Sequence, residues 1–307
     1  MKIATHNIEF LFEEGMHTHS GKEWNYTKEL VEARVSYFSK LFSEINADIL
    51  LLQEIASKSV IERIIARTGI DYSYFFGAPD QNGVGNVVLY KQKDASCESI
   101  PALTSLPVFV EGDGDVLGSR IWSRRDFVHM ELIWNGKKLH IVDVHIKANF
   151  LMPEKNTQGE AMVMTTQITA ADGLIRSEIF RFSQAKKLRE LIDTFFVIDP
   201  DALVVVGGDY NAEENYAVYR IIRGVINDAP DTLVEAGAKI EQEKRFSSLS
   251  KTLGRNRLLD HFLISKSLEP RLIGVQILND NISENNNTAP SPNLVGSDHA
   301  PIVIELK

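Results

Sequence analysis

A short apolar run that ends in glycine and polar residues constrains this chain more than any other feature. Residues 203–206 read Leu-Val-Val-Val, which is typical of a strand buried on both faces. Residues 207–211 follow as Gly-Gly-Asp-Tyr-Asn. A turn has the same composition, because Gly, Asp and Asn all favour turns. The alternative is that Asp209 and Asn211 are held at the carboxyl end of a core strand, against a ligand, a metal ion or a water.

Three further strand-like runs carry polar residues at their ends. These residues are Asn7 and Glu9 near the N-terminus, Glu54 after an apolar run, and Asp298 with His299 before the C-terminal run. Each buried carboxylate would need its own partner, and a shared divalent cation is the simplest common one. Oxygen ligands from Asn7, Glu54 and Asp298 suit Mg²⁺ or Mn²⁺ better than zinc. The sequence therefore predicts a metal site formed by these three residues.

The order of the motifs along the chain resembles the endonuclease/exonuclease/phosphatase superfamily. The motifs are Asn7, Gln53-Glu54, His145, Gly208-Asp209-Tyr210-Asn211, Asp260-His261 and Ser297-Asp298-His299. Deoxyribonuclease I, the apurinic/apyrimidinic endonucleases, the neutral sphingomyelinases and the inositol polyphosphate 5-phosphatases belong to that superfamily. Tyr210 differs from the Phe or Leu of the family's motif, and His6 replaces a bulky residue, usually Trp. We expect His6 to fill space rather than to join the site.

The resemblance implies an α/β (α+β) fold, a four-layered αββα sandwich in which two packed mixed sheets are flanked by helices. We expect one domain over residues 1–307, since α/β folds of this length are common. Apolar periodicity predicts the same two kinds of element. Strands are expected at about 2–8, 48–53, 73–76, 84–91, 120–134, 138–146, 203–207, 258–264, 271–278 and 300–306, and helices at about 26–46, 57–68, 176–197 and 215–224.

The resemblance also implies roles around an attacking water. Asp209 would accept a proton from that water, with Asn211 steadying the water or a phosphate oxygen. His299 would stabilise the pentacovalent state as a cation or donate a proton. Asp260 matches the family's acid that hydrogen-bonds this histidine, although it is also readable as a plain strand-end acid. These four residues, with His145, are the expected catalytic set.

His145 and Lys147 lie on one face of an alternating strand. His145 matches the family's second catalytic histidine, whereas a lone histidine there would more often be structural. Lys147 is either a phosphate contact or a solvated edge lysine. Arg181 belongs to a segment, Arg181-Phe182-Ser183-Gln184-Ala185, that resembles the Arg-x-x-Gln-Ala helix of one bacterial nuclease branch. We expect Lys147 and Arg181 to bind phosphate.

Arg125 corresponds best to the family's basic residue before the strand that follows it, and we expect it to contact phosphate through its planar guanidinium. The neighbouring Arg120 and Arg124 fit a solvated turn equally well. Residues 149–173 follow His145 with few charges, and we expect this segment to be a rim loop that selects the substrate. Residues 279–293 are expected to form a polar loop.

Composition limits the possible partners and locations. The net charge of −9 gives no general attraction to nucleic acid, so a polyanion would be held by the metal and a few basic contacts. No long uncharged apolar run is present, so no membrane span is expected. The single Cys97 excludes an intramolecular disulfide and is compatible with a reducing cytosol. We expect a cytoplasmic monomer, with secretion left open for a chain trimmed of a signal peptide.

The expected activity is that of a divalent-metal-dependent phosphodiesterase, in the first place a nuclease that hydrolyses DNA or RNA without sequence preference. A phosphatase or phospholipase C-like enzyme acting on inositol phosphates or sphingomyelin is the alternative, and its metal site and histidines would look the same. A binding scaffold with a spent site is a third class. The intact set of expected ligand positions argues against that scaffold.

Overall fold

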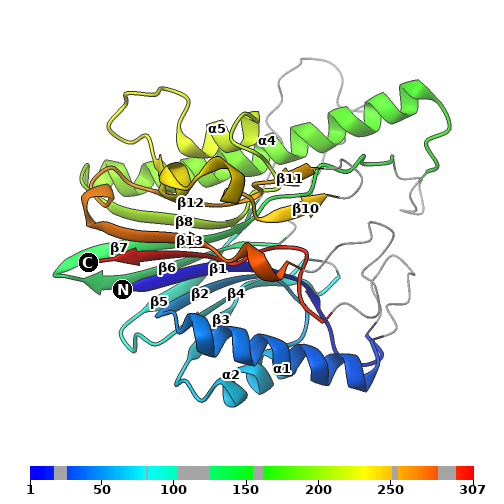
Figure 1. The fold of residues 1–307 in the computed structure, drawn as a ribbon. Helices are drawn as coiled ribbons and strands as arrows, with labels where there is room; N and C mark the ends of the chain where they lie inside the picture. Colours follow the sequence, from blue (N-terminus) through cyan, green and yellow to red (C-terminus); the bar gives the residue numbers. More distant parts are fainter. Residues whose placement is uncertain (17–25, 81, 103–124, 155–161, 251–254, 283–294) are drawn as a thin grey trace.

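Two six-stranded mixed sheets pack face to face, and helices cover both outer faces (Figure 1). The structure is a computed structural model that describes residues 1–16, 26–80, 82–102, 125–154, 162–250, 255–282 and 295–307. The strand order is β13-β14-β1-β2-β4-β3 in the first sheet and β5-β6-β7-β8-β12-β9 in the second. The expected four-layered αββα sandwich is therefore confirmed.

The first sheet and its two helices come from both ends of the chain. Helix α1 begins after Thr27, whose side chain accepts a hydrogen bond from the Leu30 amide, and Ser57 caps α2 in the same way. Both helices bury apolar stripes against the sheet. The elements are β1 (Lys2–Leu11), α1 (Lys28–Ile45), β2 (Ile49–Ile55), α2 (Lys58–Thr68), β3 (Ser73–Phe76), β4 (Gly85–Tyr90), β13 (Leu272–Ile277) and β14 (Ile302–Leu306).

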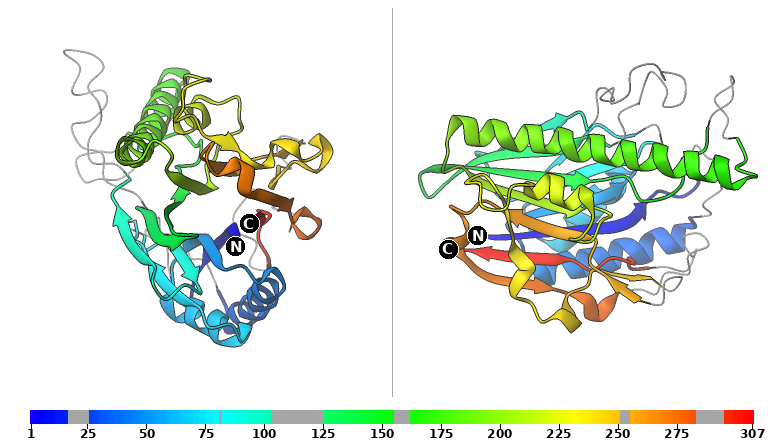
Figure 2. Two further views of the ribbon diagram at one scale, coloured as in Figure 1. Left: turned by 90° about the vertical axis from the view of Figure 1, so that its left-hand side faces the viewer. Right: turned by 90° about the horizontal axis from the view of Figure 1, so that it is seen from above.

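The second sheet is formed by the middle of the chain, and α4 runs along its outer face (Figure 2). Its elements are β5 (Ser96–Ile100), β6 (Phe127–Trp134), β7 (Lys137–His145), α4 (Gln167–Ile198), β8 (Leu203–Asp209), α5 (Ala217–Arg223), β9 (Val234–Glu235) and β12 (Asp260–Ile264). A separate hairpin consists of β10 (Ser248–Ser250) and β11 (Arg255–Arg257). Short 3₁₀ turns cover Ala236–Lys239, Gln242–Lys244, Glu269–Arg271 and Asn279–Asn281.

Parallel strand pairs place four carboxyl ends at one end of the sandwich. Strands β1 and β2 are parallel and joined through α1, and β7 and β8 are parallel and joined through α4. The N- and C-termini lie together at the opposite end (Figure 1). Strands β12 and β14 run antiparallel to their neighbours, so they begin where the parallel strands end. Polar residues far apart in the sequence therefore meet at this end.

The two glycines of β8 are required by close packing between the strands. A Cβ atom on Gly207 would lie 2.3 Å from the Phe262 ring. A Cβ atom on Gly208 would lie 2.0 Å from the Val144 carbonyl oxygen, and Gly208 has a φ of +142°. Only glycine fits at both positions, so the pair brings Asp209 close to the end of β7.

Several expected boundaries differ from the structure. Helix α4 begins at Gln167 rather than near 176, so residues 167–173 of the expected rim loop are helical. Strands β5, β9, β10 and β11 were not expected. Residues 120–124 of an expected strand, with Arg120 and Arg124, lie outside the described residues, as do residues 155–161 of the rim loop and 283–293 of the polar loop. Within the described chain, no helix is long and apolar enough to cross a membrane.

A buried hydrogen-bonded link joins the two sheets. The Gln53 amide nitrogen donates to Asp143 Oδ1 at 2.6 Å and to Thr5 Oγ1 at 3.1 Å. Asp143 is fully buried on β7. Burial raises the pKa of its carboxyl well above the usual range, and the hydrogen bonds from Gln53 and Val144 oppose this rise only in part. Asp143 is therefore a buried acid whose neutral form is favoured.

We expect Asp143→Asn to increase the free energy of unfolding at alkaline pH. The pKa of Asp143 is higher in the folded than in the unfolded state, so the wild-type protein loses stability as pH rises through the folded pKa. Asparagine keeps the acceptor for Gln53 and cannot ionise, so the variant lacks this loss. Urea unfolding between about pH 5 and 9 measures the difference. The exposed Asp71→Asn is the control, and a variant less stable than wild type at alkaline pH would contradict the assignment.

Candidate active site

Polar side chains of both sheets meet at the carboxyl ends of β1, β2, β7 and β8. The Asn7 side-chain amide donates to Asp209 Oδ2 at 3.0 Å and to Glu54 Oε1 at 3.3 Å. His145 Nε2 lies 3.5 Å from Asp209 Oδ2 and 3.6 Å from Glu54 Oε1. All four side chains are buried or nearly so. Two members of the expected metal set, Asn7 and Glu54, thus contact two members of the expected catalytic set, Asp209 and His145.

An aspartate–histidine pair faces this group from the antiparallel strands. His299 Nδ1 lies 2.6 Å from Asp260 Oδ2, and Asp260 stands opposite Asp209 in the β8–β12 register. Burial opposes the charged imidazolium, but the negative charges of Asp260, Asp298 and Asp209 together outweigh burial and raise the pKa of His299 well above its usual range. His299 is therefore held as a cation at neutral pH.

Asp209 is oriented by the loop that follows β8. The Asn211 backbone amide donates to Asp209 Oδ1 at 2.7 Å, and its side-chain amide donates to Asp209 Oδ2 at 2.9 Å. Burial raises the pKa of Asp209 to about 7, and the Asp260 carboxylate adds to the rise. The charge of His299 and the hydrogen bonds from Asn211 and Asn7 oppose it. A carboxylate with a pKa near neutrality suits proton transfer to and from water.

The carboxylates of Glu9, Glu54 and Asp298 lie on the first-sheet side of the cluster. The Asp298 amide donates to Glu9 Oε2 at 3.3 Å, and the Phe10 amide donates to Glu54 Oε2 at 3.2 Å. Burial and the Asp298 charge raise the pKa of Glu9 to about 8, and burial also raises the pKa of Glu54. Carboxylates crowded in this way fit a bound divalent cation, because its charge would stabilise all of them. A hard ion also matches their oxygen donors.

Glu9 is the acid that the sequence interpretation left out of the expected ligand set. It lies two residues after Asn7 at the exit of the same strand, and this position was the available signal. Asp209, Asp260 and His299 are another possible ligand group, and their ligand atoms lie within 4.8 Å of one another. The carboxylates of Glu9, Glu54 and Asp298 remain the better candidates, because Asp260 Oδ2 and His299 Nδ1 already pair with each other at 2.6 Å.

Strained backbone conformations concentrate around the cluster. Among the described non-glycine residues with positive φ, Asn46 ends α1 and Asn135 lies in the β6–β7 turn. The other five lie in or beside the cluster: Glu9 (51°), Phe10 (50°), Glu54 (66°), Arg125 (55°) and Asn211 (48°). Such conformations persist where the surrounding structure imposes them, and they cluster at functional sites.

Arg125 lies against His145 at the edge of the cluster. Its Nη1 is 2.8 Å from His145 Nδ1 and 3.7 Å from Glu54 Oε1, and its Nε is 3.3 Å from Asp80 Oδ2. Burial, followed by the charges of Arg125 and His299, lowers the pKa of His145 well below its usual range. His145 is therefore neutral. The Arg125 side chain keeps 20% of its surface exposed, so a phosphate can reach it.

Lys147 and Arg181 are not directed into the cluster. Lys147 Nζ donates to the Phe150 carbonyl and to Ser177 Oγ, both at 2.8 Å, on the side of α4. The fully buried Arg181 donates to the carbonyl oxygens of Lys147 and Asn211 at 3.0 Å. Arg181 therefore supports the backbone at Asn211. Because it has no exposed surface, it cannot make the phosphate contact expected from the sequence.

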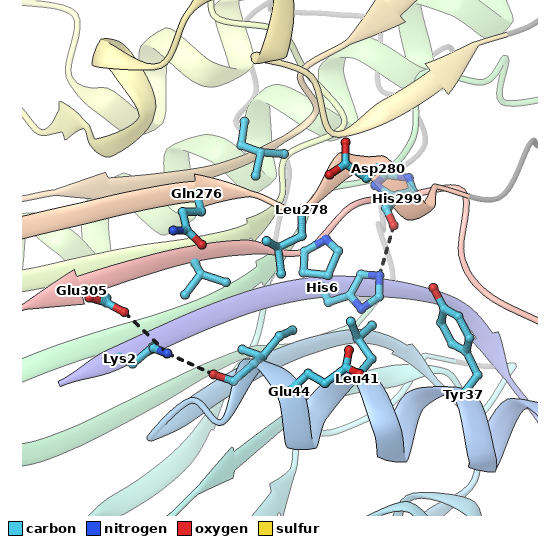
Figure 3. Close-up of a pocket in the computed structure, with 14 residues that line it drawn as sticks. Lys2, His6, Tyr37, Leu41, Glu44, Gln276, Leu278, Asp280, His299 and Glu305 are labelled. Carbon is cyan, nitrogen blue, oxygen red and sulfur yellow. Dashed lines mark hydrogen bonds and ion pairs between the residues drawn. The ribbon is translucent and has the colours of Figure 1, made fainter.

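His6 supports His299 from the opposite face of the first sheet. Its Nε2 lies 3.1 Å from the His299 carbonyl oxygen (Figure 3), and its ring packs edge-on against the Phe38 ring at a centroid distance of 5.8 Å. Burial lowers the pKa of His6 to about 4. A cavity of about 340 Å³ opens on this side, between α1 and the strands β13 and β14, and is lined by polar residues including Lys2 and Asp280. His6 packs as expected and stays outside the carboxylate cluster.

The two-sheet sandwich, with acids, an amide and an Asp–His pair at one end, defines a class of phosphoric ester hydrolases. The chain belongs to the Endonuclease/Exonuclease/phosphatase family, whose model matches residues 4–299. This membership confirms the resemblance inferred from the motifs. A comparison with curated proteins finds no match.

Solved structures of similar fold cover almost the whole chain. D. rerio TDP2 complexed with a single-strand DNA product is 14% identical with a TM-score of 0.57, covering 99% of this chain and 97% of that one. The human Nocturnin catalytic domain with bound sulfate is 16% identical with a TM-score of 0.58, covering 100% and 94%. A mannosyl-6-phosphatase from Bacteroides thetaiotaomicron is 14% identical with a TM-score of 0.59, covering 100% and 99%. These likenesses establish the fold.

Proposed function

We propose that the chain is a nuclease that hydrolyses phosphodiester bonds of DNA or RNA with a divalent cation, Mg²⁺ or Mn²⁺. The observation that carries the proposal is the meeting of Asp209, a cationic His299 and the Glu54 carboxylate at one end of the sandwich. A nucleic acid substrate is supported by the partly exposed Arg125 beside this group. The similar fold that was solved with a single-strand DNA product adds support at the level of fold alone.

The proton transfers are assigned to Asp209 and His299. Asp209, with a pKa near 7, accepts the proton of the attacking water, and Asn211 keeps the carboxylate in place through two hydrogen bonds. His299 is positively charged and stabilises the negative charge that develops on the phosphoryl oxygens, or protonates the leaving oxygen. Asp260 positions His299 and maintains its charge.

The phosphate is held by neutral and cationic donors on the opposite side. His145 is neutral and donates a hydrogen bond to a non-bridging oxygen, while Arg125 offers its guanidinium to a second oxygen. Glu54, Asn7 and Asp298, with Glu9 as a further acid, would hold the divalent cation. A divalent ion in such a site supplies Lewis-acid stabilisation of charge on phosphoryl oxygens.

A substrate panel tests the proposed function. Purified protein with Mg²⁺ is assayed on plasmid DNA, single-stranded DNA, RNA, inositol polyphosphates and sphingomyelin, with His299→Ala purified identically as the control for contaminating enzymes. We expect nucleic acid cleavage to be the fastest reaction. Faster release of phosphate from inositol polyphosphates, or of phosphocholine from sphingomyelin, would overturn the nuclease assignment and leave the hydrolytic centre in place.

We expect Arg125→Ala to weaken nucleic acid binding about tenfold, equally for all sequences, because a lost charge-assisted phosphate contact costs about 1.4 kcal/mol. The slope of log K against log salt should fall in magnitude by about 0.7–0.9, corresponding to one phosphate. Fluorescence anisotropy in a His299→Ala background measures binding without cleavage. Arg67→Ala, which removes an exposed arginine on α2, is the control and should leave both quantities unchanged. A sequence-dependent loss would contradict the assignment.

A further inference from the structure

A second group of metal-ligating side chains lies on the face of the second sheet that α4 covers. His129 and Glu131 belong to β6, and His140 belongs to β7, where it pairs with Glu131 in register. His140 precedes His145 by five residues of strand, so their Cα atoms are about 17 Å apart along β7. The group therefore shares no residue with the candidate active site.

The ligand atoms of this group converge on one point. His129 Nε2 lies 3.0 Å from His140 Nδ1, and Glu131 Oε2 lies 3.8 Å from the same His140 nitrogen. All three ligand atoms lie within 4.8 Å of one another. Two imidazole lone pairs that face each other repel, so a proton or a cation must lie between them.

Neighbouring side chains prepare these atoms for a cation. Glu98 Oε1 lies 2.8 Å from His129 Nδ1, and a hydrogen bond from this nitrogen to Glu98 orients the ring with Nε2 toward the cluster. Lys138 Nζ forms an ion pair with Glu131 Oε1 at 2.8 Å, so the second oxygen, Oε2, is available as a ligand.

An aromatic residue of α4 closes the apolar side of the group. The Phe195 ring stacks on His140 at a centroid distance of 4.0 Å and an angle of 9°, and on His129 at 4.9 Å. The side chains of His129 and His140 are only 8% and 11% exposed. Glu131, at 32% exposure, keeps an opening to solvent through which an ion can enter and a water can complete the coordination.

We propose that His129, His140 and Glu131 bind a transition-metal dication of the Zn²⁺ class, with Glu98 orienting His129. Two imidazole nitrogens and one carboxylate oxygen are the donors of a zinc site with one open position, and Mg²⁺ prefers oxygen donors. Tetrahedral zinc, at about 2.0–2.1 Å from each nitrogen, needs nitrogens about 3.3 Å apart. The two nitrogens are 3.0 Å apart, so they would have to separate by only a few tenths of an ångström to bind the ion. The bound ion would tie β6 and β7 together beneath the C-terminal half of α4.

Zinc titration of the full chain tests this site. The protein is stripped with a chelator, dialysed and kept in excess Mg²⁺, which supplies the active site with its preferred ion, and Zn²⁺ is titrated against a chromophoric chelator. We expect one Zn²⁺ to bind tightly to the wild-type protein and to Glu54→Gln. Binding should weaken at least about tenfold in His140→Gln and in Glu131→Gln. The partly exposed Glu131→Gln keeps the test valid if His140→Gln does not fold.

A spectroscopic readout identifies the ligands directly. With Cu²⁺ as the probe, the wild-type spectrum should show nitrogen hyperfine coupling from two imidazoles, and His140→Gln should show one. Hydrolysis by His140→Gln should equal that of wild type. Absence of tight Zn²⁺ binding, or a Zn²⁺ affinity unchanged in both cluster variants, would overturn the proposal, and the His129–His140 contact would then be a proton-sharing pair.

Discussion

Glu54→Gln is expected to reduce hydrolysis to the background of the assay while the fold remains intact. Glu54 lies at the end of an apolar strand and has a positive φ. Burial raises the pKa of its carboxyl, so ionising it costs free energy that a bound cation would offset. Glutamine keeps the shape and the acceptor for the Phe10 amide but lacks the charge that holds a divalent ion. Turnover with Mg²⁺, together with circular dichroism, measures both parts of the prediction.

Chelation should produce the same loss in the wild-type protein. EDTA is expected to abolish turnover, and added Mg²⁺ or Mn²⁺ should restore it in wild type but not in Glu54→Gln. Glu131→Gln is the matched control, because it removes a carboxylate of equal size far from the active site. Full wild-type activity in EDTA would rule out the metal site.

His299→Ala is expected to lower turnover by about 10²–10⁴-fold, the usual range for a positioned proton-transfer group. Asp260→Asn should cost less, because it removes the partner that orients His299 and raises its pKa and leaves the imidazole present. Without the Asp260 charge the pKa of His299 falls, so the protonated imidazole is lost at a lower pH. The loss of activity in Asp260→Asn should therefore grow as pH rises.

The pH–rate profile decides between these roles. We expect Asp260→Asn to approach wild-type turnover at the acid end and to fall away at the alkaline end of the profile. Asp209 has a pKa near 7 that the Asp260 carboxylate helps to raise, so wild-type turnover should decline as pH falls below neutrality, and turnover of Asp260→Asn should decline only at a lower pH. An Asp260→Asn variant as damaged as His299→Ala at every pH would contradict the assignment.

Buried apolar runs made most of the sandwich predictable from the sequence. Residues 203–206 were predicted as a core strand, and the structure buries all four completely or nearly so. The start of α4 gave no such signal, because Ile168 and Ile175 are 69% and 52% exposed and form no inward stripe. Strand β5 reads Ser-Cys-Glu-Ser-Ile. Its apolar residues are too few and too irregularly spaced to predict either a strand or a helix.

The candidate site was predictable where it depends on strand ends and not where it depends on long-range main-chain contacts. The strand-end rule singled out Asn7, Glu54 and Asp209, which the structure brings together. Lys147 and Arg181 donate to carbonyl oxygens, whose positions no residue pattern reveals. The group of His129, Glu131 and His140 was not predicted, because alternating polar residues on two strands are also typical of a solvated face.

Oxygen-isotope labelling under single-turnover conditions tests most directly the central claim that water, activated by Asp209, attacks phosphorus. The preferred substrate from the panel is mixed with excess enzyme and Mg²⁺ in H₂¹⁸O, and the products are analysed by mass spectrometry. We expect one ¹⁸O atom in the phosphate product and none in the alcohol, with labelled phosphate formed at least about 10²-fold more slowly by Asp209→Ala. Label in the alcohol, or unlabelled phosphate in the first turnover, would contradict it, since the latter would mean that an enzyme carboxylate attacks phosphorus.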